Sequence, residues 1–251
     1  MNEVRTNFLP GHSGTPLAVH RLGSGRPVVL LHGLFSSAQV NWIKFGTAAR
    51  LAEAGFEAIM PDLRAHGQSD APHDPADYPS EVLIKDTLAL VAALGLTDYD
   101  LAGFSLGART ALGAVLAGLT PRRLVLGGMG LEGLTGWARR SAHFIDAIDR
   151  FGTIERGDPA FFAQAFMKTM QVDRTAARLL LGSVEDIAPE GIARIAMPAL
   201  VVCGAADHDN GSAPALADAL PRGHYAEVPG THMSSVTKPE FGEAIVRFLA
   251  V

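Results

Sequence analysis

A serine flanked by glycines is the residue of this sequence that points most directly to chemistry. The segment Gly103-Phe104-Ser105-Leu106-Gly107 fits the pattern G-x-S-x-G, follows a short apolar run and opens a helical pattern. Such a sharp turn needs glycines close by, and it places the serine at a helix N-terminus, where backbone N–H groups favour developing negative charge. The pattern alone is weak evidence. Its position between strand and helix favours a nucleophile at Ser105 over an N-capping serine.

A serine hydroxyl is a weak nucleophile until a base takes its proton. Among the nine histidines, His232 lies between the last predicted strand and the last predicted helix, in Pro229-Gly230-Thr231-His232-Met233. Histidine suits this task because its side chain ordinarily titrates near neutrality. We therefore predict His232 as the base, and the alternative is a histidine that only caps a helix or fills a loop.

An imidazole base needs a carboxylate that fixes its tautomer and stabilises the imidazolium. Asp207 follows the predicted strand 199–203 through Gly204-Ala205-Ala206, and Asp209 is the competing candidate. We predict Asp207 as this acid. The run Asp207-His208-Asp209 also has metal-ligand residue types, but three side chains so close in sequence do not converge on one ion without unusual turns. The sequence therefore predicts neither a metal nor another cofactor.

Attack on a carbonyl develops an alkoxide, which preorganised N–H donors stabilise by about 3 kcal/mol each. One donor is expected to be the backbone N–H of Leu106, directly after the serine. The second is expected from the loop His32-Gly33-Leu34-Phe35, at the end of the first long apolar strand. We predict the Leu34 N–H, with the Phe35 N–H as the alternative.

Positioning these residues requires a sheet whose strands end at one edge. Short apolar runs alternate with helical patterns, which predicts an α/β fold with a mostly parallel sheet flanked by helices. Residues 4–9 and 17–21 are expected to form an antiparallel edge hairpin, 41–54 a helix, and Ser80 the N-cap of a helix that ends near residue 94. The pattern is helical throughout 131–194, which predicts a small cap inserted after a core strand. We expect the core to comprise 1–130 and 195–251.

Composition limits the classes of partner. The chain has 251 residues, 48% of them apolar, and a net charge of −5. An acidic chain without a basic stripe is a poor candidate for binding nucleic acid. Its apolar runs are too short to span a bilayer, and its first ten residues lack the apolar run of a secretory signal. We therefore expect a cytoplasmic protein without membrane insertion, while the oligomeric state stays open.

The order serine, aspartate, histidine resembles the α/β-hydrolase superfamily, in its serine-nucleophile, esterase-like branch. His32-Gly33 is similar to the oxyanion motif of that family, and residues 62–70 to the turn after its fourth strand. Gly204 with Asp207, and Pro229-Gly230 with His232, resemble its acid and histidine motifs. Two positions depart from the family pattern, because Ala65 replaces a glycine and Arg109 a small residue. Serine at position 105 argues against the epoxide-hydrolase and dehalogenase branches, which use aspartate.

The resemblance implies an ester hydrolase that cleaves a small or medium apolar carboxylic ester through an acyl-enzyme intermediate. A thioesterase, lactonase, carbon–carbon bond hydrolase or acyltransferase would use the same residues. A non-catalytic ligand-binding module on the same fold is the alternative of another class. The predicted cap is rich in large apolar side chains, which either pack the cap onto the core or line a pocket over Ser105: Trp137, Phe144, Phe151, Phe161, Phe162, Phe166, Met167 and Met170.

Overall fold

The computed structural model describes residues 3–251, and within them one sheet of eight strands forms the centre of the molecule. Its order is β1-β2-β4-β3-β5-β6-β7-β8. Strands β3 to β8 run parallel, while β2 is antiparallel to both β1 and β4. This confirms the predicted fold class and the N-terminal hairpin. The strands are β1 (Arg5–Pro10), β2 (Pro16–Gly23), β3 (Arg26–Leu31), β4 (Phe56–Pro61), β5 (Asp100–Phe104), β6 (Leu124–Gly127), β7 (Ala199–Gly204) and β8 (Gly223–Val228).

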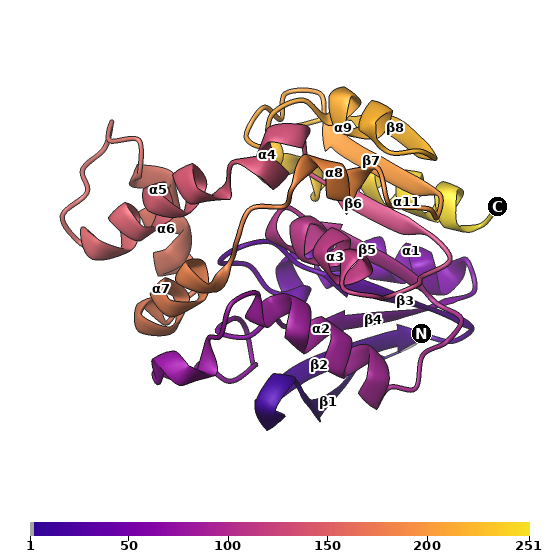
Figure 1. Cartoon of the computed structure of the whole chain (residues 1–251), viewed down its shortest axis with the longest axis horizontal. Coiled ribbons are helices and arrows are strands. Elements are labelled where there is room, and N and C mark those ends of the chain that lie inside the picture. Colours follow the sequence, from indigo (N-terminus) through magenta and orange to yellow (C-terminus); the bar gives the residue numbers. More distant parts are fainter. Residues whose placement is uncertain (1–2) are drawn as a thin grey trace.

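Helices cover both faces of the sheet (Figure 1). Side chains of α1 and α11 pack on one face, in a cluster with Trp42 and Phe241, and those of α2, α3 and α9 pack on the other. The inner strands are buried on both sides, as parallel strands are when helices cover both faces. The core helices are α1 (Thr47–Glu53), α2 (Val82–Ala93), α3 (Leu106–Leu116), α9 (Ala213–Ala219), α10 (His232–Ser235) and α11 (Pro239–Leu249).

The segment after β6 is helical up to β7, and Figure 1 shows α5, α6 and α7 set apart from the sheet. We describe residues 131–194 as the cap; that they form a separate unit stays a prediction. None of the helices in the described part of the chain is both long and apolar enough to cross a membrane. The cap helices are α4 (Leu131–Thr135), α5 (Trp137–Asp149), α6 (Phe161–Thr169), α7 (Arg174–Ser183) and α8 (Pro189–Ile192).

Two local predictions are wrong. The helix expected over 41–54 is instead a π-helical turn, Gln39–Ile43, followed by α1, because Gly46 adopts a left-handed φ of 85° that a continuous helix does not allow. Ser80 does not cap α2. The N-cap position is Glu81, and the Ser80 hydroxyl donates to Glu185 instead.

Candidate active site

The turn between β5 and α3 holds Ser105 in a conformation that few non-glycine residues adopt. Its φ is 53° and its ψ is −115°, and its N–H donates to the Gly127 carbonyl at 2.8 Å. Gly103 and Gly107 permit this turn because they have no side chains, and the backbone around them leaves no room for one. A Cβ at Gly107 would lie 2.1 Å from the Leu31 carbonyl oxygen, and one at Gly103 would lie 2.2 Å from the Gly107 backbone. Strain of this kind is concentrated at functional sites.

The three residues singled out from the sequence meet above the carboxyl ends of their strands. His232 Nε2 lies 3.0 Å from the Ser105 hydroxyl oxygen, and His232 Nδ1 lies 2.9 Å from Asp207 Oδ2. His232 is the first residue of α10, whose N-terminus is held by a capping box at Thr231. The Phe104 ring packs against the imidazole, with ring centroids 5.0 Å apart. All three side chains are buried, so their hydrogen bonds are shielded from water.

The environment of Asp207 favours its charged form. Burial by itself would raise the pKa of this carboxyl, but the hydrogen bond from His232 and donors from Asp209 and Cys203 hold the pKa below its ordinary value. The Cys203 thiol donates to Asp207 Oδ2 at 3.3 Å, and burial raises the pKa of that thiol to about 12. Cys203 is therefore a neutral donor, a role that the sequence does not signal.

Asp209, the competing acid, is exposed and supports Asp207 through its backbone. Its N–H donates to Asp207 Oδ1 at 3.2 Å. Asp207, Asp209 and His232 offer ligand atoms within 4.8 Å of one another, as a metal site would. Both ring nitrogens of His232 already lie in hydrogen bonds to Ser105 and Asp207, so the arrangement favours a relay of hydrogen bonds over metal ligation.

The hydrogen bonds of the loop after β3 distinguish the two candidates for the second oxyanion donor, the N–H groups of Leu34 and Phe35. The Phe35 N–H donates to His66 Nε2 at 2.9 Å, and the Gly33 N–H donates to the Asn41 side chain at 2.9 Å. Within residues 3–251, neither the Leu34 N–H nor the Leu106 N–H donates to a protein acceptor. Both Leu34 and Leu106 line the cavity beside Ser105. The sequence did not reveal the part played by Asn41, which is the first residue of the helix predicted over 41–54.

A cavity of about 1180 Å³ lies between the core and the cap and reaches Ser105 and His232. Four of the large cap side chains line it. Three of these four also belong to or pack against the buried core, as Phe151, Phe161 and Met167 do, so the two interpretations overlap. Phe162 is 82% exposed although it lines the cavity. The lining cap aromatics are Trp137, Phe144, Phe162 and Phe166.

Arg109, one helical turn after Ser105, joins the core to the cap. Its side chain is 1% exposed, its guanidinium donates to Glu81 at 3.2 and 3.4 Å, and it lies over the Trp137 ring at 5.6 Å. Glu81 also accepts the N–H of Glu185, which lies between α7 and α8 of the cap. The arginine that departs from the family pattern thus fills the junction between α2, α3 and α5.

Comparisons with known proteins agree with this architecture. A family model described as the alpha/beta hydrolase fold matches residues 26–124. The esterase from Exiguobacterium antarcticum superposes with a TM-score of 0.79 at 21% identity, covering 98% of this chain and all of that one. The chain therefore has the α/β-hydrolase fold, and residues 26–124 match the family model for it. An enol-lactonase from Burkholderia xenovorans has the same fold, with a TM-score of 0.73 at 22% identity over 98% of this chain and all of that one.

Relatives with curated names match only part of the chain. Epoxide hydrolase 2 from Siraitia grosvenorii is 34% identical over 99 residues, which are 39% of this chain and 30% of that protein. N-formylmaleamate deformylase from Pseudomonas putida is 36% identical over 105 residues, 41% of this chain and 37% of that protein. The chain thus spans about a third of the length of these curated relatives.

Proposed function

We propose that this α/β-hydrolase cleaves an apolar carboxylic ester through an acyl-enzyme intermediate. The observation that carries the proposal is the unbroken chain of hydrogen bonds from Asp207 through His232 to the Ser105 hydroxyl, beside two unoccupied backbone N–H donors. A hydrogen-bonded base activates a serine hydroxyl, and a preorganised pair of amides stabilises the alkoxide that forms on the attacked carbonyl.

In this mechanism His232 takes the proton of Ser105 as the oxygen attacks the carbonyl carbon. The Leu34 and Leu106 N–H groups stabilise the oxyanion, and Asp207 stabilises the imidazolium. His232 then returns the proton to the leaving alcohol, which departs. A water molecule activated by the same imidazole releases the acid from Ser105 and restores the enzyme.

The cavity supports an apolar acyl or alcohol group. Its cap wall carries aromatic side chains, and a largely apolar pocket with a few polar groups is typical of small-molecule sites. The curated relatives named epoxide hydrolases resemble only part of the chain. The hydroxyl of Ser105, in place of the aspartate expected of that branch, favours acyl transfer over epoxide opening.

The test is hydrolysis of p-nitrophenyl esters of increasing acyl length by the wild type and by Ser105→Ala, with fluorophosphonate labelling in parallel. Ester turnover and labelling of Ser105 are expected. The alanine variant should lose kcat by about 10⁴-fold or more while circular dichroism stays unchanged. Turnover of an epoxide such as styrene oxide without any ester turnover would overturn the proposal. Absence of ester turnover, of epoxide turnover and of labelling would instead favour a binding module.

A further inference from the structure

We propose that His66 is a positioning residue of the oxyanion hole. By accepting the Phe35 N–H, it fixes the peptide planes of the loop after β3 and leaves the Leu34 N–H as the free donor beside Ser105. The inference rests on the proposed ester hydrolysis, since it assigns the origin of one of its oxyanion donors. His66 lies in the loop after β4 and does not line the cavity, so it acts only through the backbone of Phe35.

The two contacts of the His66 ring define its tautomer. Nδ1 lies 2.9 Å from the Arg64 carbonyl oxygen, which can only accept, so Nδ1 carries the proton. Nε2 is then the bare nitrogen, and it accepts the Phe35 N–H at 2.9 Å. A fully buried ring with both nitrogens engaged has one orientation. Burial and the nearby His32 lower the pKa of His66 to about 3, which keeps this acceptor unprotonated.

Phe35 needs such a partner because its backbone is strained. Its φ is 57°, in the left-handed region that a bulky residue rarely adopts, and its side chain is 2% exposed. Strained backbone persists only where the surrounding structure holds it in place. Without an acceptor, the buried Phe35 N–H would add an unpaired donor to that strain. Rotation of the loop would then relieve the backbone strain and expose the unpaired Phe35 N–H to a new partner, and it would move the Leu34 N–H.

The two loops hold each other through further bonds. The Leu63 N–H donates to His32 Nε2 at 2.9 Å, so each loop supplies a histidine acceptor for a backbone N–H of the other. The rings of His32 and His66 lie 5.1 Å apart, edge to face. Further along, the Ala38 N–H donates to Asp62 Oδ1 at 2.8 Å. The loop after β4 thus holds the backbone of the loop after β3 in place. His66 provides the contact nearest to Leu34.

The test compares His66→Met with His66→Gln, two side chains of similar size. The Gln carbonyl can accept the Phe35 N–H, whereas the Met thioether is only a weak acceptor. We expect Met to lower kcat on p-nitrophenyl esters by about 100-fold, the effect of losing one oxyanion donor, with KM changed by less than about threefold. Gln should retain kcat within about tenfold of the wild type. A trifluoromethyl ketone, which adds to serine and leaves an alkoxide in the oxyanion hole, should lose affinity in parallel with kcat.

Three results would overturn the inference: kcat of His66→Met near the wild-type value, equal losses in Met and Gln, or a loss confined to KM. Should His66→Met fail to fold, ¹⁵N NMR of the wild type decides. A protonated Nδ1 with a bare, hydrogen-bonded Nε2 supports the assignment, and a protonated Nε2 excludes it. If the wild type does not turn over esters, the proposed function is wrong. If the wild type is active and His66→Met is equally active, only the inference about His66 is wrong.

Discussion

At the scale of single residues, the contacts of one imidazole distinguish the two candidate acids. Asp207 Oδ2 is hydrogen-bonded to His232 Nδ1, while the side chain of Asp209 is exposed and only its N–H reaches Asp207. Because the carboxylate has to fix the tautomer of the base, the two aspartates are expected to differ sharply in their effect on rate.

Replacing Asp207 by Asn should lower kcat by about 10³- to 10⁴-fold, because the amide can present its NH₂ to the imidazole and stabilise the wrong tautomer. Asp209→Asn, which keeps the backbone N–H to Asp207, is the matched control and should stay within about fivefold of the wild type. Steady-state kinetics on one ester measures both. A larger loss in Asp209→Asn would move the acid to that position.

At the scale of elements, close packing of α3 against β3 sets the position of the nucleophile. The helix approaches the strand so closely that Gly107 leaves no space for a methyl group beside the Leu31 carbonyl. A backbone oxygen has little freedom to move away, so a side chain there must displace the helix.

Gly107→Ala should therefore lower the free energy of unfolding by about 3 kcal/mol, and it should lower kcat because Ser105 shifts with the helix. Gly182→Ala in α7 is the control. That glycine is exposed with no atom within 4 Å of an added Cβ, so the change should be neutral or stabilise by up to about 1 kcal/mol. Urea denaturation compares the two, and similar stability of both variants would contradict the packing argument.

The pair of loops after β3 and β4 also predicts a pH dependence of stability. Burial lowers the pKa of His66 from 6.5 to about 3, and burial lowers that of His32 as well. A histidine with a depressed pKa binds fewer protons in the folded than in the unfolded state, so the stability it contributes is lost as pH falls below about 6.5. Each group adds a slope of up to about 1.4 kcal/mol per pH unit.

Urea denaturation of the wild type between pH 7.5 and 4.5 should show this fall in the free energy of unfolding. His66→Gln, which has no titrating ring at this position, should have a slope smaller by about one proton. An unchanged slope in this variant would mean that His66 binds a proton in the folded state within this range.

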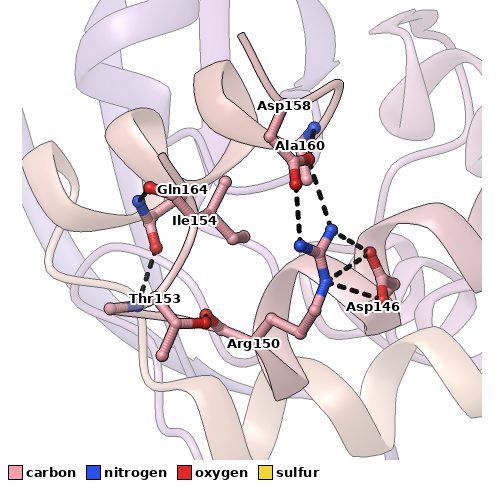
Figure 2. A network of polar contacts seen from close by, with 8 residues as sticks. Asp146, Arg150, Thr153, Ile154, Asp158, Ala160 and Gln164 are labelled. Carbon is pink, nitrogen blue, oxygen red and sulfur yellow. Dashed lines mark hydrogen bonds and ion pairs between the residues drawn. The ribbon is translucent and has the colours of Figure 1, made fainter. Parts of the chain in front are cut away.

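At the scale of the whole molecule, the cap covers the cavity, and an ionic network shapes its outer end. Figure 2 shows Arg150, the residue directly after α5, between Asp146 and Asp158. Its guanidinium lies 2.6 Å from the Asp146 carboxylate and 2.8 Å from that of Asp158. The Gln164 side chain accepts the Gly152 N–H and donates to the Ile154 carbonyl. Together they tie the connection between α5 and α6, the helix that carries Phe162 and Phe166 over the cavity.

Arg150→Gln should loosen this connection, with faster amide hydrogen exchange over residues 151–160. KM for long-chain esters should rise by about three- to fivefold and kcat should change little, as expected for loss of an exposed charge network far from the serine. Arg156→Gln is the control, because Arg156 lies in the same exposed connection and forms no ion pair within residues 3–251. An equal change in both variants would assign the effect to charge alone.

The sequence by itself determined the fold class and the candidate residues at strand ends. Alternating apolar runs and helical patterns are local properties, and they indicated the parallel sheet that the structure confirms. The motif around Ser105 could be recognised from the sequence because its glycines are required by a local turn of five residues. Ala65, which departs from the family pattern, takes a φ of 65° without glycine, so its loop tolerates strain that a local pattern does not reveal.

Only the tertiary structure decided which amide of the loop after β3 is free, because the acceptor of the Phe35 N–H is His66, on another loop. It also decided that the helix expected over 41–54 breaks at Gly46, and that Ser80 binds Glu185 instead of capping α2. It also decided which cap aromatics line the cavity, several of which pack against the core at the same time. Each of these outcomes depends on a partner that is distant in sequence or on packing against another element, and hydrophobic periodicity carries no information about either.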